Sequence, residues 1–457
     1  MPSRAGTILL VLAVLFWAEA IASVFLIVPP SGTLFNLSFG YGPYMKQMLT
    51  VGQFADCSHA VCDRATKMPF AIMLMSLLGT ISQSEVWVAV MKTLLFAFVT
   101  ILGCSAIWAQ QRRAYPRVFF AWVIVLIALL LSLPAAKHIG QITYEEGYSI
   151  PLLFMLGLMA PLLNSNRLSV DIKDRYAKAS LALGAALYLI KPALLLIFIW
   201  TMLAVVWLIV RRGRRSLVLA LILALMVPVS WGSYCWIATG RFSVTTSLVG
   251  EDMRRAANSD SVKIYPISEV DRVFDTPVVV LPDGVHVAIS PKPVRIDFPN
   301  EWTWSDYNRG QAQAWVAGHP GEWALFVEKK IHNYFFSFTK TPEQVGATPL
   351  PVSRMTVVQN MAISFWLVIG RTLALLFAVL WIRRWRNVPE DRIQLLFVLG
   401  LNAAYLAPCL VGYNYERHVT TGLVLALACL VTELAIALES LPASAMRFSV
   451  RHSAPEG

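Results

Sequence analysis

The chain has 457 residues, of which 57% are hydrophobic and only 14% are charged, and its mean hydropathy is +0.61. Soluble globular domains carry roughly 25% charged residues, so this composition excludes a soluble protein and indicates an integral membrane protein. The formal net charge of +11 and the isoelectric point near 9.4 would also suit a nucleic-acid-binding protein. The positions of the basic residues, described below, do not support that class.

Apolar runs suited to helices that cross about 30 Å of hydrocarbon recur along almost the whole chain. We count ten, near residues 7–28, 86–108, 118–136, 149–163, 179–190, 193–210, 217–237, 361–382, 394–411 and 419–438. The fourth and fifth are short for a span, and a re-entrant segment is the alternative for one of them. The predicted fold class is therefore an α-helical polytopic membrane protein with about ten transmembrane helices.

Three connecting segments break the pattern of short loops. The first, 29–85, contains a short apolar run that predicts a helix lying at the membrane surface. The second, 137–149, carries Glu145 and Glu146. The third, 238–360, holds a hairpin signal around Pro282-Asp283-Gly284 and then two helical patterns, the second beginning at Pro320.

The third segment is the only one large enough for folded structure outside the membrane, and we predict a small α/β domain there. The domain organisation that follows has three parts. They are residues 1–237, with seven spans and the outer loops 29–85 and 137–149; the large extracytoplasmic loop 238–360; and residues 361–457, with three spans and a cytoplasmic tail.

Basic residues in the short loops predict the orientation, because Lys and Arg accumulate on the cytoplasmic side. With the N-terminus inside, the cytoplasmic segments hold eighteen Lys and Arg residues, including Arg112, Arg113 and the run 211–215. The short outer loops hold six, namely Lys46, Arg64, Lys67, Lys137, Lys191 and Arg417. We expect a bacterial inner-membrane protein with both termini in the cytoplasm, and the high net charge then reflects topology.

Cys57 and Cys62 lie together in the first outer loop, where an oxidising compartment permits a disulfide. Their Cys-x4-Cys spacing, without partnering histidines, is a poor zinc signal. The outer carboxylates could hold a divalent metal such as Mg²⁺ or Mn²⁺, but no ligand spacing indicates one.

Charged residues at the membrane surface are the candidate functional residues. Lys191, Arg241 and Arg417 each follow or precede a span at the outer side, at one depth. Cations there could hold an anionic lipid headgroup through phosphate contacts, and scattered interfacial anchoring is the alternative. On the same side lie four carboxylates that could accept a proton from an attacking hydroxyl: Asp56, Asp63, Glu145 and Glu146.

Three further charges lie within predicted spans. Lys92 and Arg371 are expected to snorkel towards the outer surface. For Glu19, a protonated or helix-paired side chain and a functional site are alternatives.

Several stretches, in order, resemble the GT-C superfamily of membrane glycosyltransferases, which includes protein O-mannosyltransferases, the lipid A aminoarabinose transferase and core galacturonosyltransferase-like proteins. The stretches are YMKQMLTVGQF and RATKMPFAIML, YEEGYSIPLLFMLGLMA, LGAALYLIKPALLL, VPVSWGSYCWIATGRFSVTTSLVGEDM, WVAGHPGEWALFVEKKIHNYF and YERHVTTGLVLALA. They cover most of the chain, and each lies at the expected membrane depth.

The resemblance implies transfer of a sugar from a polyprenyl-phosphate donor to a cell-envelope acceptor such as a polysaccharide, lipid or protein, at the outer face. It implies that Arg417 contacts the donor phosphate with Lys191 nearby, and that Glu145 or Glu146 is the second-loop glutamate. Tyr44 matches the first-loop tyrosine. Two neighbours of Arg417 are supporting residues: Glu416, which would orient or neutralise it, and His418, which stands where the family more often has tyrosine.

One departure concerns the base. The family usually has an aspartate shortly before the first-loop tyrosine, but here FNLSFGYGPYMK contains no acid. Asp56 or Asp63 takes that role, or a second-loop glutamate does, or the protein is a degenerate member without activity. A lipid or glycan transporter or flippase is the rival function, and a non-catalytic scaffold is the third. The absence of an inverted repeat and the large outer segment count against transport.

Overall fold

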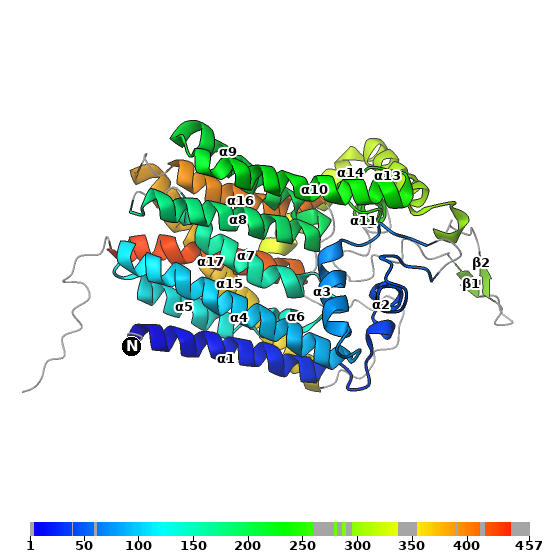
Figure 1. Cartoon of the computed structure of the whole chain (residues 1–457), viewed down its shortest axis with the longest axis horizontal. Coiled ribbons are helices and arrows are strands. Elements are labelled where there is room, and N and C mark those ends of the chain that lie inside the picture. Colours follow the sequence, from blue (N-terminus) through cyan, green and yellow to red (C-terminus); the bar gives the residue numbers. More distant parts are fainter. Residues whose placement is uncertain are drawn as a thin grey trace, which may run out of the picture.

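The computed structural model describes residues 4–38, 40–58, 62–163, 165, 167–258, 278–280, 286–288, 295–336, 354–388, 392–411 and 416–439. A bundle of long helices runs along one direction, and shorter helices cover one end of it (Figure 1). The bundle helices are α1 (Arg4–Ile27), α4 (Glu85–Ala114), α5 (Val118–Leu130), α7 (Glu146–Met159), α8 (Val170–Ile190), α9 (Leu195–Arg212), α10 (Val218–Thr239), α15 (Arg354–Asn387), α16 (Arg392–Val411) and α17 (Glu416–Glu439).

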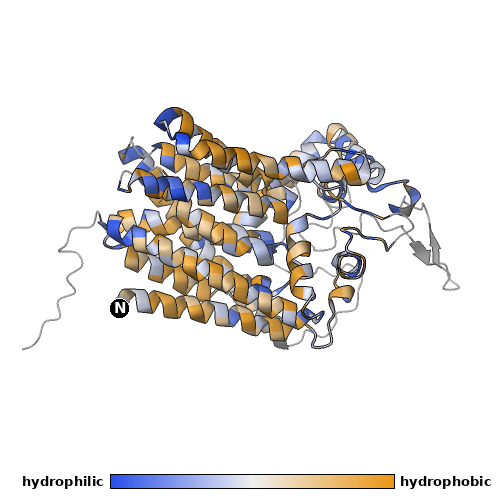
Figure 2. Ribbon diagram, in the orientation of Figure 1, coloured by the Kyte–Doolittle hydropathy of each residue, from blue (hydrophilic) through white to orange (hydrophobic). Residues whose placement is uncertain are grey.

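The structure corrects the expected number of spans. All ten apolar runs are helical, but within the described part of the chain seven helices are long and apolar enough to cross a membrane. An eighth span is added if α5 and α6 (Leu133–Gly140), which are bent by 69°, are counted as one broken span. Apolar residues dominate the bundle and polar residues its two ends, as expected of a multi-pass membrane protein (Figure 2).

The two short runs, 149–163 and 179–190, account for the difference between the ten predicted spans and the eight that the structure allows. Every residue of α7 is buried, so this helix is apolar because protein surrounds it on all sides. The run 179–190 is the second half of α8, whose first half carries the polar sequence VDIKDRYAK. Burial within the protein and contact with lipid produce the same hydropathy, which is why the sequence overcounts.

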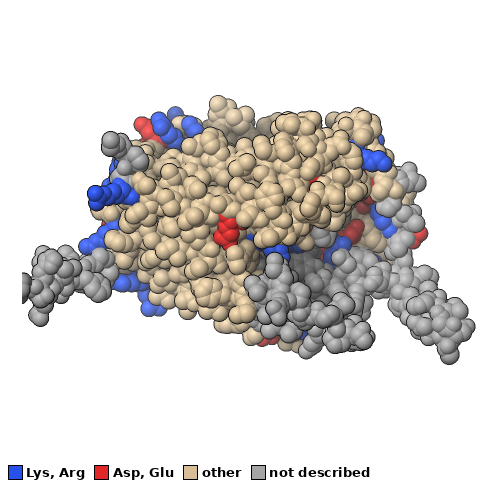
Figure 3. All heavy atoms as spheres, turned by 90° about the horizontal axis from the view of Figure 1, so that it is seen from below, with Lys and Arg blue, Asp and Glu red and all other residues tan. Residues whose placement is uncertain are grey.

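Chain connectivity divides the loops between two ends of the bundle. At the basic end, where α1 begins and α4 ends, Arg167 donates to Ala114 O at 2.9 Å and pairs with Glu439. At the loop end, Ser23 near the end of α1 donates to Ala136 O at 3.2 Å. Lys and Arg gather at the basic end, and the face between the ends is largely uncharged (Figure 3). Which end faces the cytoplasm stays a prediction.

The first loop supplies two helices to the loop end, α2 (Tyr41–Thr50) and α3 (Pro69–Gly79). Helix α3 lies across the direction of the bundle helices (Figure 1) and is the short apolar helix expected from the sequence. One side of α3 buries Ile72 and Met75, while Met73 and Leu77 are exposed.

In the described residues the large outer segment is mainly helical, with one short antiparallel strand pair, so the structure does not show the α/β domain that we predicted. It contains α11 (Val249–Ala256), α13 (Glu301–Gly318) and α14 (Pro320–Phe335), and α14 begins with its proline as expected. Strands β1 (Val278–Val280) and β2 (His286–Ala288) pair antiparallel, with Val279 opposite Val287. The turn residues 282–284 lie outside the described residues.

Glu301 joins the outer segment to the first loop. Its side chain is buried and accepts hydrogen bonds from the backbone N–H of Arg64 at 3.0 Å and of Ala65 at 3.0 Å, and from Ser247 Oγ at 2.9 Å. Burial raises the pKa of Glu301, and the hydrogen bonds from these donors oppose that shift. The first loop, the segment around Ser247 and helix α13 therefore meet at one carboxylate. We infer that the packing of these segments over the loop end of the bundle depends on Glu301.

We expect Glu301→Ala to lower the thermal midpoint in detergent by several degrees. The two backbone N–H groups lose their acceptor, and a buried unsatisfied donor costs about 1–3 kcal/mol. Differential scanning fluorimetry and limited proteolysis of the first loop measure the effect. Glu328→Ala, on an exposed position of α14, is the control and should leave both readouts unchanged. Equal stability of the two variants would contradict the role given to Glu301.

Candidate functional site

Three helix termini meet at the loop end and bring together residues that are far apart in the sequence. Helix α7 begins at Glu146, and helix α17 begins at Glu416. Helix α8 ends at Ile190 because Pro192 disfavours helical backbone at Lys191, which is extended with φ −149° and ψ 129°. The positive ends of two helix dipoles therefore point to the place where Lys191 lies.

Glu146 is the centre of an ionic cluster. Its Oε1 lies 2.8 Å from Lys191 Nζ and 3.2 Å from His418 Nε2, and its Oε2 lies 3.5 Å from Arg417 Nε. Lys191 Nζ and His418 Nε2 are 3.1 Å apart. Only 3% of the Glu146 side chain is exposed, against 21% for each of Lys191 and Arg417. The Glu146 carboxylate is therefore buried, whereas the side chains of Lys191 and Arg417 each remain partly exposed.

The cluster continues towards the first loop. Tyr41 of α2 donates a hydrogen bond to Glu145 Oε1 at 2.9 Å, and Lys67 Nζ lies 4.8 Å from the centre of the Tyr41 ring. The Arg417 guanidinium lies 4.5 Å from the ring of Tyr144. We refer to Glu145, Glu146, Lys191, Arg417, His418 and Lys67 as the ionic cluster. Three cations and two carboxylates leave it one positive charge when the histidine is neutral.

The charges of the cluster determine the protonation of its members. Burial alone would raise the pKa of Glu146, but Lys191 and Arg417 outweigh it and hold that pKa well below its usual value. For Glu145, burial is likewise outweighed by Lys191 and Lys67, so its pKa is lowered. Burial would lower the pKa of Lys191, but the two glutamates raise it. Both carboxylates and the lysine are therefore ionised at neutral pH.

Lys92 of α4 joins this helix to the end of α6, beside the start of α7. It is fully buried, and its Nζ donates to Ile139 O at 2.5 Å and Gln141 O at 2.6 Å and lies 4.8 Å from the Tyr148 ring centre. The expected snorkelling of Lys92 is therefore wrong, because the bent backbone at the end of α6 supplies acceptors inside the protein. An ionisable residue within a predicted span was the sequence signal for this role.

Arg371 also finds its partner inside the protein. Its Nη2 donates to Tyr334 O at 3.1 Å, near the end of α14, so it ties the outer segment to the bundle.

The first-loop aspartates differ in their surroundings. Asp63 is buried and pairs with Arg295, whereas Asp56 is half-buried and accepts hydrogen bonds from Ser58 N at 2.9 Å and Ser58 Oγ at 2.7 Å. Their backbones form an antiparallel bridge, beside the disulfide that joins Cys57 and Cys62.

Asp56 faces the start of α2. A Cβ atom on Gly40 would lie 3.9 Å from Asp56 Oδ2 and 3.9 Å from Lys67 Cε. Asp56 therefore brings a carboxylate to the stretch FNLSFGYGPYMK, which contains none of its own, beside a cation of the ionic cluster.

Three of the predicted site residues lie elsewhere or outside the description. Arg241 pairs with Asp306 at 2.6 Å and stacks on Trp302, and both partners belong to α13. Tyr44 is buried, with its hydroxyl 2.7 Å from Thr66 Oγ1, and packs within the first loop. Glu416 starts α17, and its side chain lies outside the described residues.

Among the described residues, no group of three or more His, Cys, Asp or Glu side chains is placed to hold a metal ion. The ionic cluster instead combines exposed faces of two cations with helix N-termini, which suits an anion. Sequence reasoning missed Tyr41 and Tyr144, because aromatic residues near a membrane surface are common.

Fold and site together define a multi-pass helical membrane protein with a buried ionic cluster where its bundle meets its loops. No protein-family model and no characterised protein sequence matches the chain. Among solved structures, the chain aligns with the crystal structure of ArnT from Cupriavidus metallidurans in the apo state. The alignment covers 92% of this chain and 76% of that one, at 16% identity and a TM-score of 0.35. At this identity and TM-score, no residue role and no activity is transferred to this chain.

We expect Glu146→Gln to lower the free energy of unfolding by about 3 kcal/mol, because two cations remain without their buried partner. The folded-state pKa of Glu146 is depressed, so its contribution is present above the unfolded value and is lost as pH falls through the folded pKa. The stability difference between wild type and Glu146→Gln should therefore persist at neutral pH and shrink below about pH 4. Denaturant titration in detergent at several pH values measures it. A difference independent of pH down to strong acid would contradict the ion-pair account.

We expect Gly147→Ala to destabilise the protein as well. An added Cβ would lie 2.5 Å from Gln141 O, 2.7 Å from His138 O and 3.0 Å from Lys92 Nζ, and overpacking of this kind costs about 1–3 kcal/mol. Gly310→Ala in α13 is the matched control, because nothing lies within 4 Å of its added Cβ. Thermal unfolding should separate the two variants, and an unchanged midpoint for Gly147→Ala would show that the start of α7 can shift.

Proposed function

We propose that this protein transfers a sugar from a polyprenyl-phosphate donor to a hydroxyl acceptor at the outer face of the membrane. The observation that carries the proposal is the ionic cluster, in which Lys191 and Arg417 converge on one buried carboxylate while each keeps an exposed side. A lipid phosphate at this depth would meet both cations and the N-terminus of α17. The predicted orientation would place this end outside the cytoplasm.

In the proposed reaction, the acceptor oxygen attacks the anomeric carbon of the sugar and the bond from that carbon to the phosphate oxygen breaks. The phosphate keeps the electron pair of that bond and leaves as polyprenyl phosphate, stabilised by Lys191 and Arg417. The hydroxyl proton passes to Asp56, the carboxylate that is half-buried beside Gly40 and Lys67. Glu146 holds the two cations in place.

Asp56 is preferred to the other three carboxylates on its surroundings. Asp63 is buried against Arg295, and both glutamates have lowered pKa values that make them weaker bases. A general base contributes about 10²–10⁴-fold to the rate. Asp56 lies in the first loop, where GT-C glycosyltransferases usually have their aspartate, but at a different position in that loop.

Membranes containing the protein and a panel of radiolabelled polyprenyl-phosphate sugars test the proposal, with labelled product as the readout. We expect Asp56→Asn to lower turnover at least about 100-fold at unchanged expression. Arg417→Ala should raise the KM for the donor more than it changes kcat if the phosphate is contacted in the ground state. Asp171→Asn and Arg175→Ala, both exposed in α8 at the basic end, are the matched controls.

The outcomes separate the competing functions. No labelled product from any donor, together with flux of a lipid or glycan across the membrane, would indicate a transporter. Neither product nor flux would indicate a non-catalytic protein. Full activity in Asp56→Asn with loss in Asp63→Asn would keep the transferase and move the base.

A further inference from the structure

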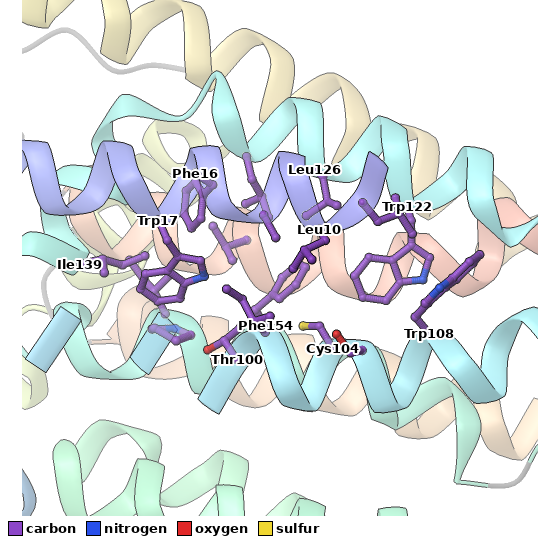
Figure 4. Close-up of a pocket in the computed structure, with 18 of the residues that line it drawn as sticks. Leu10, Phe16, Trp17, Thr100, Cys104, Trp108, Trp122, Leu126, Ile139 and Phe154 are labelled. Atoms are coloured by element: carbon purple, nitrogen blue, oxygen red, sulfur yellow. The ribbon is translucent and has the colours of Figure 1, made fainter. Parts of the chain in front are cut away.

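An apolar slot lies inside the bundle, away from the ionic cluster. Most of its lining residues lie on α1, α4, α5 and α7, and Ile139 of α6 and Val424 of α17 complete it. The space between these walls, about 760 Å³, includes the side on which the slot opens to its surroundings. Figure 4 shows its side chains, among them Trp17 and Phe16, in a row between α1 and α4.

The length of the slot suits a hydrocarbon chain. Its wall on α1 runs from Gly6 to Trp17, a stretch of helix that rises about 16 Å, or about half the hydrocarbon thickness of a bilayer. Its wall on α4 runs from Thr100 to Trp108. Small side chains at Ala13 and Cys104 leave the space open. The slot thus extends over one leaflet, from the basic end towards α6.

Basic residues surround the end of the slot at which Gly6 and Trp108 lie. Arg4 starts α1 two residues before Gly6, and Arg112 and Arg113 end α4 one turn beyond Trp108. All three side chains are exposed. Basic residues at the mouth of a gap between helices suit an anionic lipid headgroup.

We propose that the slot holds one acyl chain of an anionic phospholipid from the leaflet at the basic end, with its headgroup at Arg4, Arg112 and Arg113. This site is separate from the ionic cluster and does not depend on the proposed transferase activity. The acyl chain is held in the slot by van der Waals packing. The hydrophobic effect does not contribute, because the walls of the slot are surrounded by lipid rather than water before the chain enters. The headgroup supplies the selectivity.

Phosphatidylglycerol with a diazirine at the end of one acyl chain tests this on the full-length protein in nanodiscs. After illumination, mass spectrometry of the peptides should find crosslinks to the slot face of residues 6–17 and 100–108. Ala13→Trp fills the slot and should reduce these crosslinks to background. Val14→Trp, the same change at the adjacent exposed position of α1, should not.

A second filling variant with its own control keeps the test valid if Ala13→Trp does not fold. Cys104→Trp fills the slot from α4, and Leu102→Trp at an exposed position is its control. Arg112→Gln with Arg113→Gln should weaken retention of phosphatidylglycerol by about fivefold per arginine, the equivalent of about 1 kcal/mol each. Phosphatidylcholine with the same labelled chain should be retained less than phosphatidylglycerol.

Three results would overturn the proposal. Crosslinks that persist in both filling variants, or that are as frequent on exposed positions, would show that the slot is not occupied by the chain. Equal retention of the two lipids would remove the headgroup site. Thr100 Oγ lines the slot, is buried and has no hydrogen-bond partner among the described residues. An acyl chain does not need it, so loss of labelling in Thr100→Val would indicate a polar ligand instead.

Discussion

The burial of one carboxylate beneath two cations organises this protein. Glu146 is 3% exposed and lies 2.8 Å from Lys191 Nζ, so none of the charges at this depth could be left alone without a large desolvation cost. The three chain segments that carry Glu146, Lys191 and Arg417 must therefore meet. Their meeting sets the relative positions of α7, α8 and α17, and α7 and most of α17 are buried as a result.

The cover of the loop end follows from the same constraint. Tyr41 reaches Glu145 from α2, so the first loop rests on the cluster, and Glu301 ties that loop to the helices of the outer segment. Gly422 lets the outer segment approach α17 closely, since an added Cβ there would lie 1.9 Å from the hydroxyl of Tyr334. Each contact joins a loop to the bundle through a polar group or a residue without a side chain.

Hydropathy and spacing predict which residues form helices and how deep each residue lies in the membrane. They do not predict which helices are neighbours in the bundle. The positions of Lys191 and Arg417 at one depth could be predicted, because each adjoins an apolar run. Their shared partner Glu146 could not, since depth leaves the angular position of a helix undetermined. The same limit explains α7, whose apolar sequence reflects burial in protein, and Lys92, whose acceptors come from a bend that hydropathy does not show.

Lys92 and Tyr148 form a polar layer beside the loop-end part of the apolar slot. Lys92 binds the carbonyl of Ile139, a residue whose side chain lines the slot, and its ammonium lies 4.8 Å from the centre of the Tyr148 ring. A charge held there by two backbone carbonyls makes continuation of a hydrocarbon chain through this layer costly. A hydrocarbon chain in the proposed lipid site would therefore end at this layer.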